Sequence, residues 1–263
     1  MRYALKFAYD GTKFEGYARQ PKMITIEGEI IRALKAKSIA QDLQSASRTD
    51  RGVSAAGNVI VIETDFALKG IIPALNSELE GIHFHGIAKV PEDFNPRHAE
   101  QRWYRYVFLK GHCPPVRELG KASKLFLGEH DFRLLSKKDT GHEKTVLAID
   151  SITFTETGEF VYADIKAQRF LWEMVRRMLS VIVSVAEEKT DAVTVEKLLT
   201  GESALKGGIK PLPPENLVLM DVVYDLEFRS VVTGHSYFAD EVKSLRGRAE
   251  VISLVAEALR GPE

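Results

Sequence analysis

The sequence predicts an α+β protein whose two halves repeat one order of elements and share one antiparallel sheet. Short segments alternate apolar and polar residues, as half-buried strands do, and amphipathic segments typical of helices lie between them. Read in order, these segments follow the pattern β-α-β-β-α-β once up to residue 98 and once again after it. We therefore expect two similar units rather than one uninterrupted fold.

The first half begins with a strand at residues 2–9, because the odd positions are aromatic or aliphatic and the even positions are basic or small. Asp10 and Gly11 end this strand, since both residue types favour turns. A helix is predicted at 26–35, with Thr25 placed to cap its first turn. The remaining predicted elements of this half are strands at 43–47 and 58–64, a helix at 69–79 and a strand at 82–90.

In the second half, the predicted helix at 169–187 is apolar on most sides. Glu173, Arg176 and Arg177 interrupt it, and the segment is shorter than a membrane span requires, so we expect a buried central helix. The remaining predicted elements of this half are a strand at 102–110, a helix at 118–127 stopped by Gly128, strands at 146–155 and 160–167, a short helix at 194–199 and a strand at 217–228.

An order of β-α-β-β-α-β is typical of the ferredoxin-like unit. We expect two such units, 1–98 and 99–229, joined side by side into one extended, largely antiparallel sheet with helices on one face and a cleft between the halves. Residues 230–263 are expected to form a helical extension. Within it, 240–259 carries apolar residues alternately three and four apart, the pattern of a helix pair. Docking on its own subunit is expected ahead of a dimer contact.

Charge and cysteine content limit the function classes. Lys and Arg total 36 against 37 Asp and Glu, so a net charge of -1 gives no global signature of nucleic-acid binding, and any RNA contact requires local clustering. The single Cys113 excludes an internal disulfide and a C-x-x-C metal or redox site. The N-terminus carries charges too close together for a signal peptide. These features favour a cytoplasmic protein.

The segment 47–55 contains the densest group of candidate functional residues. It is expected to turn sharply at Asp50-Arg51-Gly52, because glycine supplies the positive φ that such turns require. Alternation along an extended segment should make Arg48 and Asp50 project together, with Arg51 and Ser54 close by.

This segment resembles the R-T-D-x-G-V-H-A signature of the TruA family of tRNA pseudouridine synthases, with Ser54 at the usual histidine position. The resemblance covers roughly residues 1–228. Trp172 and Glu173 also stand where many relatives carry histidines, so those histidines are not essential in an active member. Further segments similar to the family occur in the expected order at 9–16, 94–97, 102–106, 127–132, 170–176 and 213–219.

The resemblance implies that Asp50 is the catalytic nucleophile or base and that Tyr104 packs on the target base. It makes Arg48 and Arg176 substrate-binding residues, with Arg176 as the buried partner that holds Asp50 charged. It also implies a homodimer that modifies uridines at positions 38 to 40 of the anticodon arm of tRNA, with no cofactor, no metal and a catalytic cleft between the two units. The expected RNA-binding residues are Lys13, Arg19, Arg51, Arg97, Arg102 and Arg169.

Two other function classes remain as alternatives. A catalytically silent RNA-binding protein could use the same scaffold, although the set Arg48, Asp50, Tyr104 and Arg176 argues against it. A metal-dependent phosphodiesterase could use Asp10 and Asp50, but neither has further carboxylate or histidine partners nearby in the sequence. The pair His83 and His85 lacks a third ligand at suitable spacing and is better explained as a solvated or hydrogen-bonded strand face.

Overall fold

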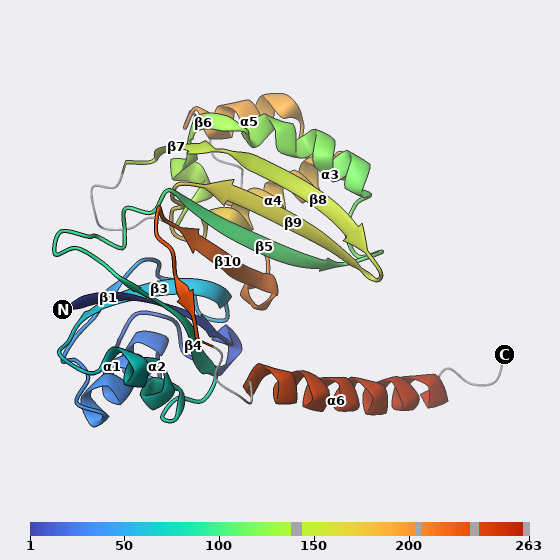
Figure 1. Ribbon diagram of the computed structural model, residues 1–263. Coiled ribbons are helices and arrows are strands. Elements are labelled where there is room, and N and C mark those ends of the chain that lie inside the picture. Colours follow the sequence, from blue (N-terminus) through green and yellow to red (C-terminus); the bar gives the residue numbers. More distant parts are fainter. Residues whose placement is uncertain (138–143, 203–206, 232–236, 260–263) are drawn as a thin grey trace.

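The computed structural model describes the chain except for residues 138–143, 203–206, 232–236 and 260–263. It is a mixed α+β protein built on one large, mostly antiparallel sheet (Figure 1). Its strands are β1 (Arg2–Tyr9), β2 (Gln44–Ser45), β3 (Ser54–Glu63), β4 (Ile82–Lys89), β5 (Gln101–Leu109), β6 (Gly128–Asp131), β7 (Val146–Ile149), β8 (Ser151–Thr157), β9 (Phe160–Ala167), β10 (Leu217–Val223) and β11 (Arg229–Ser230). Its α-helices are α1 (Ile26–Ala36), α2 (Leu68–Asn76), α3 (Val116–Ser123), α4 (Met174–Ala186), α5 (Ala192–Leu199) and α6 (Tyr237–Leu259).

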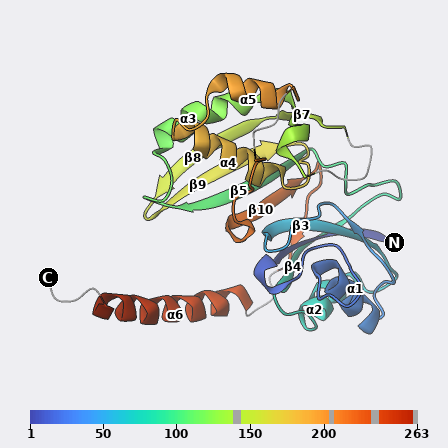
Figure 2. The same cartoon turned by 180° about the vertical axis from the view of Figure 1, so that it is seen from behind.

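The large sheet has the strand order β11-β4-β1-β3-β10-β5-β9-β8, and β2 is added beside β3. A separate small sheet pairs β6 with β7. In both views α1 and α2 lie with the strands of the N-terminal half, whereas α3, α4 and α5 lie with those of the C-terminal half (Figures 1 and 2). The two sets of helices leave the middle of the sheet, around β3 and β10, as the meeting point of the halves.

The N-terminal half is organised by β1, whose apolar odd positions, from Tyr3 to Tyr9, are all buried. β1 is central because it pairs antiparallel with β3 on one side and with β4 on the other. α1 begins where the sequence predicts, and Thr25 Oγ1 accepts a hydrogen bond from the Gly28 amide at 3.2 Å. The predicted cap is therefore confirmed.

The two halves join through a short parallel pairing of β3 with β10, which aligns Val218 with Ser54 and Leu219 with Ala55. Lys6 of β1 adds an ion pair across the join, with its Nζ 2.6 Å from Asp221 Oδ1. On the other side β10 pairs antiparallel with β5, so it connects the two sets of strands. This pairing brings the beginning of β3 next to β10, the last strand of the C-terminal half in the large sheet before β11.

Several predicted elements need correction. The predicted helix at 169–187 begins only at Met174, because Glu173 has a left-handed backbone with φ of 59° and ends the preceding irregular segment. The predicted strand at 146–155 is two strands: β7 pairs with β6, whereas β8 pairs with β9. The strand β6 was missed. The predicted strand at 217–228 ends at Val223, and that at 43–47 shortens to β2.

The C-terminal helix α6 forms at the predicted position but does not dock as expected. Val242, Leu245 and Ile252 are 45%, 53% and 63% exposed, and both views show α6 extending away from the sheet (Figures 1 and 2). An ion pair between Lys13 Nζ and Glu241 Oε1, 3.3 Å apart, links its first turn to the N-terminal half. For the described side chains, the expectation that the apolar stripe packs on its own subunit is therefore wrong.

None of the described helices is long and apolar enough to cross a membrane.

We predict that Gly11→Ala destabilises the fold. A Cβ at Gly11 would lie 2.0 Å from the Val53 carbonyl oxygen, a backbone atom, and the position of the Cβ is itself fixed by the Gly11 backbone, so neither atom can move without the chain that carries it. The overpacking should lower the free energy of unfolding in urea by about 1–3 kcal/mol.

The matched control is Gly120→Ala in α3, where nothing lies within 4 Å of an added Cβ. This change should be neutral or stabilise the helix by about 0.5–1 kcal/mol. Equal unfolding curves for the two variants would contradict the close approach at Gly11.

Candidate active site

The turn at 50–52 forms as the sequence predicts. Gly52 has a φ of +86°, and the Val53 amide donates a hydrogen bond to the Asp50 carbonyl at 3.1 Å. Gly52 also lies against Pro214, whose Cγ would be 3.1 Å from an added Cβ. A side chain at this position would be disfavoured by both the backbone and the neighbouring proline.

Hydrogen bonds from β1, and from the residue Gly11 that follows β1, hold the backbone on either side of this turn. Before the turn, the buried hydroxyl groups of Tyr9 and Thr49 are hydrogen-bonded at 2.8 Å. After it, the Gly11 amide donates to Ser54 Oγ at 3.0 Å. Ser54, the position where the sequence departs from the family signature, thus has a structural hydrogen bond. These contacts hold Asp50 in a set orientation.

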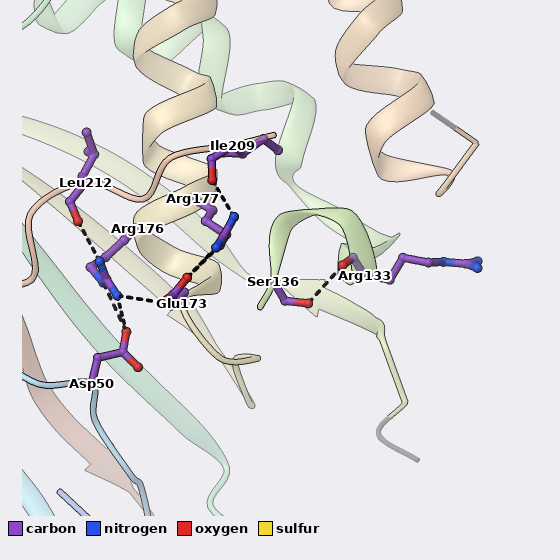
Figure 3. A network of polar contacts seen from close by, with 8 residues as sticks. All are labelled: Asp50, Arg133, Ser136, Glu173, Arg176, Arg177, Ile209 and Leu212. Atoms are coloured by element: carbon purple, nitrogen blue, oxygen red, sulfur yellow. Dashed lines mark hydrogen bonds and ion pairs between the residues drawn. The ribbon is translucent and has the colours of Figure 1, made fainter. Parts of the chain in front are cut away.

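The Asp50 carboxylate points at the guanidinium of Arg176 in the first turns of α4 (Figure 3). Asp50 Oδ2 accepts hydrogen bonds from Arg176 Nη2 at 2.6 Å and from Nε at 3.2 Å. The Arg176 side chain is 7% exposed and that of Asp50 is 20% exposed. The predicted burial of Arg176 and its pairing with Asp50 are therefore confirmed.

Glu173 and the segment before Pro213 complete the surroundings of this pair (Figure 3). Arg176 Nη1 donates to the Leu212 carbonyl at 2.9 Å, and Arg176 Nη2 lies 3.7 Å from Glu173 Oε1. The other Glu173 oxygen accepts from Arg177 Nη2 at 2.6 Å, and Arg177 Nη1 donates to the Ile209 carbonyl. Three chain segments therefore meet at the two arginines.

Sequence reasoning missed Glu173 and Arg177 as parts of this network. A signal was available, since Glu173 lies three and four residues before Arg176 and Arg177, the spacing at which helical side chains meet.

Tyr104 of β5 lies in the same region. It is buried, and its ring meets that of Phe170 edge-on, with centroids 5.2 Å apart and an interplanar angle of 90°. Burial raises the pKa of Tyr104 well above its ordinary value; the Arg102 guanidinium lowers this pKa, and the Asp50 carboxylate raises it. The hydroxyl is therefore protonated at physiological pH and can donate a hydrogen bond.

Arg102, expected to bind RNA, has a different environment. It is 7% exposed, and its guanidinium donates to Ser47 Oγ at 2.9 Å and to the Ala46 carbonyl at 3.0 Å. It also donates to the backbone carbonyls of Arg97 and Gln168. Because four of the five guanidinium N–H groups are used within the protein, the expected surface contact is wrong. Arg102 instead holds the segment before Asp50 against two other segments.

The remaining candidate cations lie nearer the surface. Arg48 is exposed, and no described residue makes a hydrogen bond or ion pair with its side chain. It lines an open cleft of about 520 Å³ together with Arg19 and Arg97, whereas Asp50 turns away toward Arg176. Arg48 and Asp50 thus have different surroundings, although they are two residues apart. Arg51 is exposed, Arg169 is half-buried and donates to the Lys144 carbonyl, and Lys13 and Arg19 form ion pairs with Glu241 and Asp42.

Among the described residues, no group of three or more His, Cys, Asp or Glu side chains could hold a metal ion. Asp10 is engaged in the turn after β1, where its carboxylate accepts from the Thr12 amide at 3.0 Å and from the Thr12 hydroxyl at 2.6 Å. His85 Nε2 lies 2.9 Å from the Ala56 carbonyl oxygen, and burial together with His85 lowers the pKa of His83. These contacts favour the hydrogen-bonded strand face over a metal pair.

Comparison with known proteins identifies the family. Residues 122–225 match the family model described as tRNA pseudouridine synthase. The chain is 44% identical over 233 residues to tRNA pseudouridine synthase A of Pyrococcus furiosus, an alignment that covers 87% of this chain and 86% of the relative. The chain belongs to the TruA family of tRNA pseudouridine synthases. The same protein of Pyrococcus abyssi is 42% identical over 232 residues, with 87% of both chains covered.

As a member of the TruA family, the chain is an isomerase that converts uridine in tRNA to pseudouridine. Among solved structures, the protein resembles one chain of the archaeal box H/ACA sRNP Nop10–Cbf5 complex. The alignment covers 69% of the present protein and 42% of that matched chain. With 12% identity and a TM-score of 0.36, this similarity is too low to bear on function.

We predict that Arg176→Met destabilises the protein by about 3–5 kcal/mol, because it leaves the Asp50 carboxylate without its partner in a largely buried site. The free energy of unfolding in urea measures this loss. Arg176→Lys should recover only part of it, since an ammonium group cannot reproduce the Nε and Nη2 contacts.

Arg32→Met is the control for loss of an arginine from an exposed ion pair. Arg32 Nη2 lies 2.8 Å from Glu29 Oε2, and its side chain is 51% exposed. This variant should lose less than about 1 kcal/mol. If both arginine-to-methionine changes cost the same, the special contribution of the Asp50 pair is refuted.

Proposed function

We propose that Asp50 is the catalytic nucleophile or base of this tRNA pseudouridine synthase and that its targets are uridines at positions 38 to 40 of the anticodon arm. The observation that carries the proposal is the two-point hydrogen bonding of the Asp50 carboxylate by Arg176. This contact fixes one carboxylate oxygen, Oδ2, and leaves Oδ1 outside the pair. A charged oxygen held in place in this way is suited to attack or to proton removal.

The reaction requires no external reactant. The bond from ribose C1′ to N1 of the base breaks, the base turns, and a bond from C1′ to C5 forms; the C5 proton leaves and N1 gains a proton. Asp50 supplies the carboxylate, and Tyr104 supplies a ring for the base together with a protonated hydroxyl. No cofactor or metal takes part in the proposal.

Binding of the tRNA is assigned to cations around this site. Arg48 contacts the substrate from the open cleft it shares with Arg19 and Arg97, and its guanidinium is exposed, which supports this role. These contacts go to phosphates, so salt should weaken them. The rim proposed for the RNA consists of Lys13, Arg19, Arg51, Arg97 and Arg169.

The proposed architecture has two ferredoxin-like units, 1–98 and 99–229, followed by the extension 230–263. The strand orders β4-β1-β3-β2 and β10-β5-β9-β8 support it. In each half, the strands that belong to the large sheet lie in the order fourth, first, third, second, although β2 has only two residues. The helices would then share one face of the sheet. A homodimer in the cytoplasm, with one tRNA lying across both subunits, completes the proposal.

We predict that Asp50→Asn abolishes pseudouridine formation while tRNA binding persists, because the amide keeps the shape of the side chain and loses its charge. Unmodified tRNA transcripts incubated with each variant, with pseudouridine mapped by position, provide the test. Wild type should modify positions 38 to 40.

Asp65→Asn serves as the control, because Asp65 is an exposed aspartate beside the N-terminal amine. This variant should be fully active. Activity of Asp50→Asn within about tenfold of wild type would remove Asp50 from its catalytic role. Binding of tRNA by wild type without any pseudouridine would instead favour a silent RNA-binding protein.

We predict that Tyr104→Phe and Tyr104→Ala separate two contributions of this residue. Phenylalanine keeps the ring and loses the hydroxyl, so it should bind tRNA normally and turn over more slowly; alanine should also weaken binding, by about 1–3 kcal/mol. Filter binding and single-turnover rates measure the two quantities. Equal tRNA affinities for the two variants would show that Tyr104 does not pack on the target base.

A further inference from the structure

Trp172 is an exposed aromatic residue in a segment whose neighbouring side chains contact residues of the candidate active site. Its side chain is 44% exposed. On one side along the chain, Phe170 packs edge-on against Tyr104 at 5.2 Å. On the other, Glu173 lies 3.7 Å from the Arg176 guanidinium that binds Asp50. Trp172 is therefore the outward-facing member of a segment that borders the site.

The indole of Trp172 is held in place on one side by Lys137. The Lys137 ammonium lies over the ring, 4.2 Å from its centroid, and the Lys137 amide donates to the Trp172 carbonyl at 2.9 Å. Both the ring and its backbone are thus fixed by the same residue. Under this contact the Trp172 residue is still 44% exposed, so part of its surface is available to a ligand.

The backbone next to Trp172 is strained. Glu173 has φ of 59° and ψ of 2°, a left-handed conformation that residues with a side chain rarely adopt. Strain of this kind persists where surrounding contacts impose it, and it concentrates at ligand sites. Here the Glu173 carboxylate accepts hydrogen bonds from Arg177, and the helix α4 begins only at Met174. The arrangement keeps Trp172 out of the helix and near the surface.

We propose that Trp172, supported by Lys137, stacks on a nucleobase next to the target uridine in the bound tRNA. The proposal rests on the function proposed above for the Asp50 site. A base flanking a nucleotide extracted from its stack has lost a neighbour, and an aromatic side chain replaces that stacking without reading the base.

Tryptophan fluorescence tests the contact directly, because the chain contains two tryptophans, Trp103 and Trp172. The indole of Trp103, in β5, donates a hydrogen bond to Asp164 Oδ1, in β9, at 2.6 Å. In a Trp103→Phe variant, titration with an unmodified tRNA transcript should quench the emission of Trp172. In a Trp172→Phe variant, the emission of Trp103 should stay unchanged.

Affinity provides the second measurement. Trp172→Ala should weaken tRNA binding by about tenfold, whereas Trp172→Tyr, which keeps a stacking ring, should stay within about threefold of wild type. Phe160→Ala is the matched control, since Phe160 is 41% exposed and lies at the opposite end of β9 from the segment containing Trp172. It should bind as wild type does.

The proposal is overturned if Trp172 emission is unchanged at saturating tRNA, or if Trp172→Ala and Phe160→Ala bind equally well. Both measurements are independent of turnover. An Asp50→Asn variant that stayed active would therefore refute the proposed catalytic residue without affecting the stacking test. If Trp172→Ala fails to fold, the fluorescence titration still decides.

Discussion

The buried ion pair between Asp50 and Arg176 is the contact on which the site depends. A carboxylate and a guanidinium can leave water at acceptable cost only if each meets the other with good geometry and the remaining N–H groups find acceptors. The Leu212 carbonyl accepts one of these N–H groups, and the Glu173 carboxylate adds a second negative charge 3.7 Å from Arg176 Nη2. The pair therefore determines the positions of the turn before β3, the first turns of α4 and the segment before Pro213.

The periodic parts of the fold could be predicted from the sequence, because β1 and α1 bury one regular face and their ends carry local turn and cap residues. The irregular parts could not. Residues 169–173 continue the apolar pattern of α4, yet Phe170 packs against Tyr104 and Glu173 adopts a left-handed backbone. Likewise, nothing local in 146–155 indicates that its first part pairs with β6 and its second with β9. In both segments, contacts with residues distant in sequence determine the local structure.

The candidate site was predicted in part. The pairing of Arg176 with Asp50 followed from the cost of an arginine within an apolar helix together with the family resemblance. Arg102 was misplaced, although its position two residues before buried Tyr104 on the same face of β5 indicated burial. The charge of Arg102 alone suggested RNA binding, whereas the alternation of apolar and polar residues along β5 correctly indicated that Arg102 is buried. Ser54, which departs from the family signature, accepts a hydrogen bond from the Gly11 amide, and this partner is 43 residues away in sequence.

The narrow parallel join between β3 and β10 has a consequence for how the protein folds. Asp50 and Arg176 are 126 residues apart in sequence, so their contact requires closure of a long loop, an entropic cost that delays non-local pairing. Each half has its own antiparallel strands and can organise before this closure, whereas the active site belongs to neither half. A local opening at the join would separate the two charges while most of the secondary structure remained. With the role proposed for Asp50, catalytic activity reports on the docking of the halves, and it should be the first property lost when that docking loosens.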